Sequence, residues 1–148
     1  MKIFTLAYLI LAVFFTSCIQ SPQKTEAQVT ARDKSVTSAV SYSDLFIDST
    51  SMEKFIKQQG LRDSLANKLR SFYNNRNYQC AWFFKEGIAE YATTFYEMCN
   101  DYIGYSGDST LYNPLLQKLY DSVLSGNLKP DDSLAIKTEL LFTSQFFR

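Results

Sequence analysis

From about residue 44 onward, apolar side chains recur at steps of three and four, the spacing that places them on one face of an α-helix. Glycine, asparagine and proline divide this pattern into five segments. The helices are expected near residues 50–60, 61–72, 86–102, 113–126 and 130–148. No stretch alternates between apolar and polar residues clearly enough to predict a strand. The pattern therefore predicts an all-α fold, a single bundle-like domain of about five helices.

Some of the expected helix ends carry capping residues. Thr50 and Glu53 have the spacing of a capping box at the start of the first helix, and Gly60 is expected to end it. Asn113 can cap the fourth helix with Pro114 at its first position, where the missing N–H is not needed.

The start of the chain lacks this helical pattern. Residues 1–17 combine Lys2 with an apolar run shorter than the roughly 20 residues that span a bilayer, which predicts an export signal. Small residues precede Cys18, so we expect a lipoprotein signal in which Cys18 carries the lipid, with an ordinary cleaved signal as the alternative. The polar residues 18–43 are predicted to be a flexible tether to a folded domain at 44–148. The expected location is the periplasmic side of the cell envelope, anchored to a membrane.

Composition excludes several classes of function. The sequence contains no histidine, so triads with an imidazole base and histidine-ligated metal sites are excluded. Three scattered cysteines do not make a structural zinc site. Fifteen basic and fifteen acidic residues cancel, which leaves no overall positive field for nucleic acid. We therefore expect no metal, no cofactor and no nucleic-acid partner.

Two segments carry a resemblance to a known family. Residues 72–82 read Phe-Tyr-x-x-Arg-Asn-Tyr-x-x-Ala-Trp before an amphipathic helix, and residues 139–147 read Glu-Leu-Leu-Phe-Thr-Ser-Gln-Phe-Phe. Both resemble segments of the N-terminal helical scaffold domain of the periplasmic murein L,D-transpeptidases, in particular the large YcbB-like branch of the Bacteroidetes type. The resemblance covers about residues 50–148.

In that family, the scaffold domain is joined to a catalytic domain that cross-links peptidoglycan stem peptides through a cysteine in a Ser-His-Gly-Cys-type segment. No such segment occurs here, so the resemblance implies a scaffold without catalytic residues. The chain stops at Arg148 directly after Phe146 and Phe147, and truncation of a longer protein is expected, with a short natural paralogue as the alternative.

The predicted function is a non-catalytic, lipid-anchored scaffold module in peptidoglycan cross-linking and cell-wall biogenesis. Its expected partners are the membrane, peptidoglycan or cell-wall proteins, and the missing catalytic domain. The alternative is a free-standing envelope lipoprotein that binds a protein or glycan through an aromatic helical surface.

Arg76, Tyr78 and Trp82 form the most conspicuous cluster of polar and aromatic residues. They can form a surface that stacks on a glycan or binds a peptide. Alternatively, Tyr78 and Trp82 fill the corner between two helices while Arg76 binds carbonyl groups at a helix end. The other tyrosines follow helical faces and loops without a shared stripe, and Tyr102 is expected on the core-facing side of its helix.

Cys80 and Cys99 can form a disulfide, because an exported protein matures in an oxidising compartment. Alternatively, Cys99 lies on an apolar helical face as a free, small hydrophobic residue. Neither cysteine has a histidine to act as its base, so a nucleophilic role is not predicted. The adjacent Asp131 and Asp132 are expected to cap the last helix, at whose N-terminus negative charge is favoured.

Overall fold

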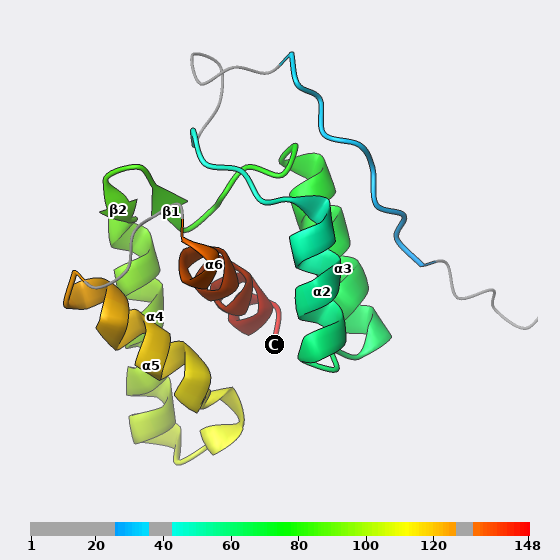
Figure 1. The fold of residues 1–148 in the computed structure, drawn as a ribbon. Coiled ribbons are helices and arrows are strands. Elements are labelled where there is room, and N and C mark those ends of the chain that lie inside the picture. The colour runs from blue at the N-terminus through cyan, green and yellow to red at the C-terminus, as the bar shows by residue number, and fades with distance from the viewer. Residues whose placement is uncertain (1–25, 36–42, 127–131) are drawn as a thin grey trace, which may run out of the picture.

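The computed structural model describes residues 26–35, 43–126 and 132–148, so the predicted signal and Cys18 lie outside the described residues. The described part contains five α-helices and one short hairpin (Figure 1). In chain order the elements are α2 (Ser49–Gln58), α3 (Asp63–Asn75), β1 (Phe83–Phe84), β2 (Gly87–Ile88), α4 (Glu90–Ser106), the 3-10 turn η3 (Ser109–Leu111), α5 (Pro114–Leu124) and α6 (Ser133–Phe146). The predicted all-α class with five helices is confirmed. Within the described residues, no helix has the length and apolar content needed to cross a membrane.

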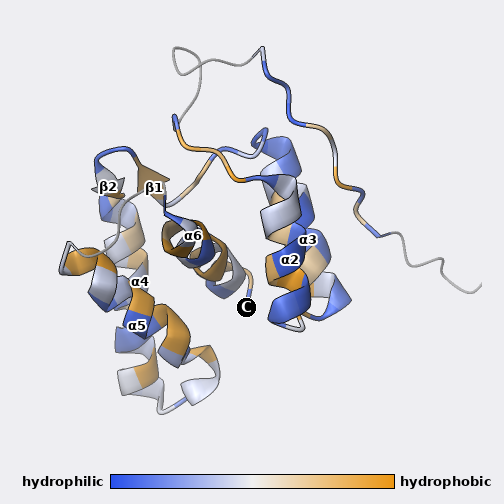
Figure 2. Ribbon diagram, viewed as in Figure 1, coloured by the Kyte–Doolittle hydropathy of each residue, from blue (hydrophilic) through white to orange (hydrophobic). Residues whose placement is uncertain are grey.

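Helix α6 lies between two helical pairs, with α2 and α3 on one side and α4 and α5 on the other (Figure 1). It contacts α2, α3 and α5 directly. Every residue from 138 to 145 is buried, so α6 is enclosed around its whole circumference. Figure 2 shows hydrophobic residues gathered on α5 and α6, whereas α3 is largely hydrophilic. The core is therefore built around the last described helix.

The helix ends agree with the predicted capping residues at one position and differ at another. Asn113 Oδ1 accepts from the backbone N–H groups of Leu115 and Leu116 at 3.2 and 3.1 Å, as predicted for the start of α5. At α2, however, Asp48 is the cap, and its Oδ2 accepts from Ser51 N at 3.1 Å. The predicted cap Thr50 lies inside the helix. Both residue types can cap a helix, and the chain takes the earlier one.

The third predicted helix begins later than expected, at Glu90, and ends at Ser106. The residues before it form the antiparallel hairpin, in which Phe83 pairs with Ile88 and Phe84 with Gly87. Gly87 has a φ of 133°, which an L side chain rarely adopts. Two paired residues per strand are too few to show alternation, which explains why no strand was predicted.

Residues 26–35, which belong to the predicted tether, run beside α3 and its C-terminal end (Figure 1). Three asparagine side chains of the helical domain accept hydrogen bonds from backbone N–H groups of residues 26–35. The pairs are Ala27 with Asn67 at 3.1 Å, Thr30 with Asn74 at 3.3 Å and Asp33 with Asn77 at 2.6 Å. Asn74 and Asn77 also donate to the carbonyl oxygens of Gln28 and Asp33. This part of the predicted tether is therefore bound to the helical domain.

Candidate functional site

A buried carboxylate organises the centre of the domain. Glu139, on α6, is 0% exposed. Its Oε1 accepts from the backbone N–H of Ala81 at 2.6 Å, and its Oε2 accepts from that of Trp82 at 2.8 Å. The segment between α3 and the hairpin has no regular structure of its own here, so α6 supplies the acceptors that its backbone requires.

Two hydroxyl groups extend this polar cluster. The Tyr73 hydroxyl, on α3, donates to Glu139 Oε1 at 2.8 Å and lies 2.5 Å from Thr143 Oγ1. Thr143 Oγ1 also accepts from Trp82 Nε1 at 2.8 Å. Tyr73, Trp82, Glu139 and Thr143 therefore join α3, the following segment and α6 in one buried hydrogen-bonded network.

Burial raises the pKa of Glu139 from 4.5 to about 7, because a charged carboxylate loses its hydration in the core. The hydrogen bonds from Ala81, Trp82 and Tyr73 act in the opposite direction but do not cancel this effect. Burial and the neighbouring carboxylate also raise the pKa of Tyr73 well above its usual value, which keeps its phenol protonated. The network can hold or release one proton, at Glu139, near neutral pH.

In the predicted cluster, Tyr78 and Trp82 are buried, whereas Arg76 is partly exposed. Tyr78 is 1% exposed and Trp82 is 8% exposed, so neither ring forms an open stacking surface. The Trp82 ring stacks on Phe95 at a centroid distance of 5.3 Å. Arg76 donates to the carbonyl oxygens of Gln79 and Cys80 at 3.5 and 3.3 Å. These positions favour the interpretation in which the rings fill a corner and Arg76 binds carbonyl groups.

Cys80 and Cys99 are free thiols in the structure, which corresponds to the second of the two alternatives that the sequence leaves open. Cys80 is buried in the segment held by Glu139, whereas Cys99 lies half-buried on α4, near Gln145. Burial raises the pKa of both thiols, most strongly for Cys80, where the Glu139 carboxylate adds to the effect. Both positions therefore disfavour the thiolate that a nucleophile requires.

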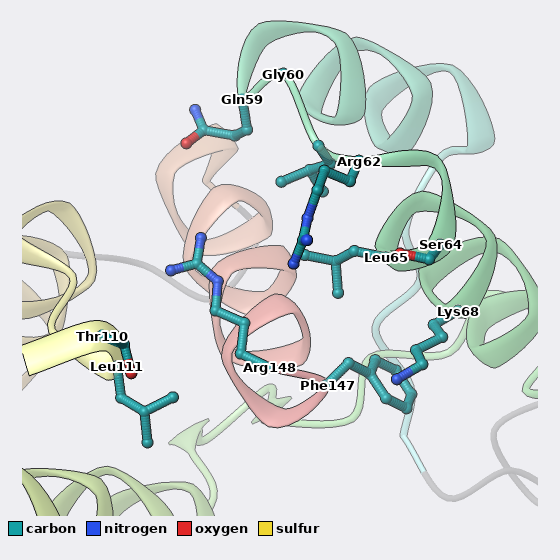
Figure 3. Close-up of a pocket in the computed structure, with 11 residues that line it drawn as sticks. Gln59, Gly60, Arg62, Ser64, Leu65, Lys68, Thr110, Leu111, Phe147 and Arg148 are labelled. Atoms are coloured by element: carbon teal, nitrogen blue, oxygen red, sulfur yellow. The ribbon is translucent and has the colours of Figure 1, made fainter. Parts of the chain in front are cut away.

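A cleft of about 520 Å³ opens between the α2–α3 turn, η3 and the C-terminal end of α6 (Figure 3). Three basic residues line it, Arg62, Lys68 and Arg148, and no lining residue is acidic. The guanidinium groups of Arg62 and Arg148 extend into the same open space (Figure 3). Lys68 Nζ lies 5.8 Å from the centre of the Phe147 ring. The cleft can bind an anionic group, but its lining side chains include no thiol or carboxylate for chemistry.

A family model described as the Scaffold domain matches residues 67–148, which is more than half of the chain. The chain belongs to the Scaffold domain family. No curated protein matches the chain, and no solved structure does either.

The matched part of this Scaffold domain begins in α3 and includes the whole network around Glu139. It also includes both segments on which the resemblance to murein L,D-transpeptidases rests. Sequence reasoning assigned no role to Glu139. The sequence feature that indicates a role for Glu139 is its position as an acidic residue inside a strongly apolar helix. An unpaired charge is unfavourable there, so the carboxylate requires a partner.

Proposed function

We propose that this Scaffold domain is the non-catalytic scaffold module of an L,D-transpeptidase-like protein, lipid-anchored in the cell envelope and acting in peptidoglycan cross-linking. The observation that carries the proposal is the hydrogen bonding between the two segments that resemble the transpeptidase scaffold domain. Tyr73 and Trp82 belong to the first segment, and Glu139 and Thr143 belong to the second. The residues that carry the resemblance therefore form one physical unit.

The use of these side chains supports a structural role. The carboxylate oxygens of Glu139 take three hydrogen bonds from buried donors, and the indole N–H of Trp82 is bonded as well. Such a network specifies how α3, the corner segment and α6 fit together. It leaves no group in an open pocket where a substrate could reach it.

The two described thiols support the non-catalytic part of the proposal. The family's chemistry uses a cysteine that becomes acylated, which requires an accessible thiolate. Cys80 is buried and its pKa is raised, and Cys99 has no histidine to act as its base.

Lipid anchoring at Cys18 would place the domain close to the membrane. Residues 26–35 are bound along α3, so only the residues between Cys18 and Glu26 separate the lipid from the docked segment. At no more than about 3.6 Å per residue, these eight steps reach about 29 Å at most. The scaffold would therefore work at short range from its membrane.

Intact mass spectrometry with a carbapenem tests the absence of catalysis. A carbapenem acylates the nucleophilic cysteine of an L,D-transpeptidase, so the purified chain is expected to show no adduct. Unfolded chain provides a control, because its exposed thiols report any non-specific reaction. An adduct on Cys80 or Cys99 of the folded protein would overturn the proposal.

The cell-wall role is tested by muropeptide analysis of cells with and without the gene. Loss of the scaffold is expected to lower the fraction of cross-links formed by L,D-transpeptidation. Wild-type protein should restore that fraction, and Cys18→Ser, which cannot be lipidated, should restore it poorly. An unchanged cross-link fraction in the deletion strain would argue against a role in this reaction.

A further inference from the structure

Helix α4 carries an exposed, largely apolar stripe that no other described element covers, although Tyr91 at its start packs against Trp82 and Phe84 and donates a hydrogen bond to the carbonyl oxygen of Ala81. Four large side chains on this helix remain largely open to solvent. They are Tyr91 at 51%, Met98 at 65%, Tyr102 at 49% and Tyr105 at 95%. Their spacing of seven, four and three residues places them within about 60° of arc, at about 100° per residue. Tyr102, expected in the core, thus lies on this outer face, and three of the four tyrosines of α4 share the stripe, whereas Tyr96 packs against Tyr120 of α5.

The stripe continues onto α6. Phe146 is 54% exposed and packs on Phe95 of α4 with the ring centres 5.9 Å apart. Trp82 lies behind both, 6.0 Å from the ring of Tyr91 and 6.0 Å from that of Phe146. The exposed rings of Tyr91 and Phe146 therefore rest on the buried Trp82, which gives a partner a preformed surface at this end of the stripe.

An acidic edge borders the stripe on the side away from the core. Glu90, Glu97 and Asp101 are exposed, and they begin about 40° beyond Tyr105 around the helix axis. Helix α4 contains no lysine or arginine. The ion pairs within the described residues join Arg70 to Glu26 and Glu53, and Lys85 to Asp44, so none of them neutralises this edge.

The apolar stripe and its acidic edge together indicate what kind of partner fits this face of α4. A second copy would bring three more acidic residues and no basic one from its own α4, so self-association gains no charge complementarity. An anionic membrane surface would be repelled for the same reason. A helix with an apolar face and a row of lysine or arginine along one edge matches both features. The stripe from Tyr91 to Tyr105 is about 21 Å long, at about 1.5 Å per residue, which is enough for four turns of such a helix.

We propose that the exposed face of α4 binds a cationic amphipathic helix of a partner protein. The apolar side of that helix covers Met98 and the tyrosines, and its basic edge pairs with Glu90, Glu97 and Asp101. This interaction goes beyond the scaffold role proposed above, because it depends only on the surface of α4 and on no catalytic partner.

Fluorescence anisotropy with a designed peptide tests this proposal on the full-length chain in detergent. The probe is a labelled helix of about 18 residues with leucine on one face and lysine along one edge. Its matched control has glutamate in place of lysine. We expect the lysine peptide to bind at least about tenfold more tightly, since several rim charges change from attractive to repulsive.

Charge-reversed variants locate the binding surface. Glu97→Lys combined with Asp101→Lys should weaken binding of the lysine peptide about tenfold. The control pair Glu86→Lys and Asp121→Lys makes the same change in net charge at exposed positions outside α4 and should change binding less than about twofold. Tyr102→Ser combined with Tyr105→Ser should also weaken binding about tenfold, and circular dichroism should report an intact fold for all three.

Several results would overturn the proposal. These are failure of the lysine peptide to bind, equal binding of the two peptides, and equal effects of the two charge-reversed pairs. A dimer abolished by the tyrosine substitutions would assign the face to a second copy instead. Binding to isolated peptidoglycan that requires Tyr102 and Tyr105 would assign it to a glycan.

Discussion

Trp82 N donates a hydrogen bond of 2.8 Å to Glu139 Oε2, and both groups are buried although 57 positions separate the residues. The bond fixes α6 against the corner after α3 at one register, because the neighbouring Ala81 N–H must reach the other carboxylate oxygen. A buried carboxylate is unfavourable by itself, so its retention requires all of these donors at once.

Replacing Glu139 with alanine should destabilise the fold strongly. Glu139→Ala leaves the buried N–H groups of Ala81 and Trp82 without acceptors and opens a cavity, so we expect a loss of about 3–5 kcal/mol at pH 6. Urea unfolding followed by the fluorescence of Trp82, the single tryptophan, measures the change. The exposed Glu90→Ala is the control and should stay within about 0.5 kcal/mol of wild type. A loss below about 1 kcal/mol for Glu139→Ala would show that the network matters little.

The same residue should make stability depend on pH. The pKa of Glu139 is raised from 4.5 to about 7 in the folded protein, so the folded state holds a proton that the unfolded state releases between these values. The resulting stabilisation is complete below about pH 4.5 and is lost as the pH rises through about 7. We expect the free energy of unfolding to fall by on the order of 3 kcal/mol over this range.

Glu139→Gln isolates this effect, because the amide does not ionise and the sequence has no histidine to titrate in the same window. Unfolding of both proteins at several pH values between 5 and 8 provides the comparison. The variant should show a nearly flat profile, and parallel profiles would refute the assignment to Glu139.

The two carboxylate partners of Arg70 should contribute differently to the free energy of unfolding. It is buried and forms paired hydrogen bonds with Glu53, from Nε at 2.7 Å and Nη2 at 2.8 Å. Glu26 also lies 2.9 Å from Nη1, but its side chain is mostly exposed. Glu53→Gln should therefore lower the free energy of unfolding by about 1–2 kcal/mol, and Glu26→Gln by less than about 0.5 kcal/mol. Equal losses in chemical denaturation would show that the paired geometry adds nothing.

The N-cap residues of α5 and α6 should also contribute differently to stability. Asn113 accepts from two backbone N–H groups of α5, whereas the side chain of Asp132 accepts none from α6. Asn113→Ala is therefore expected to reduce stability by about 1 kcal/mol. Asp132→Ala should reduce it by no more than about 0.5 kcal/mol, through the helix dipole. Thermal melting of both variants beside wild type decides the order, and a larger loss for Asp132→Ala would reverse it.

The two described cysteines should react at different rates with an aromatic disulfide reagent. Cys80 is buried and its thiol pKa is raised, so it should react only when the protein unfolds. Cys99 is partly open and should react in the folded state, more slowly than a free thiol. In a Cys18→Ser background, Cys80→Ala and Cys99→Ala each leave a single thiol and separate the two rates. Fast reaction of Cys80 in the folded protein would contradict the buried placement.

Features that depend on local sequence could be predicted. The number of helices and the cap at Asn113 follow from signals within a few residues of each other. The start of α4 could not be predicted, because its hairpin pairs only two residues on each strand. The choice of Asp48 over Thr50 as a cap also depends on how the chain enters the helix, since both residue types suit the position.

The parts that concern the site depend on distant contacts. The donors to Glu139 lie more than fifty positions earlier in the chain, so no local window could pair them with it. Periodicity places Tyr102 on an apolar side of α4 but does not say whether another helix covers that side. The position of α6 between the two helical pairs decides this, and it leaves the stripe on α4 open (Figure 1).

The enclosure of α6 also sets the order of events during synthesis. Helices α2, α3 and α5 all pack against α6, which the ribosome makes after them. Until Glu139 and Thr143 have emerged, the corner at Trp82 has no acceptors for its N–H groups, and the apolar faces of α2, α3 and α5 stay open to water. Such a nascent chain is exposed to aggregation or to chaperone binding until translation has passed this point.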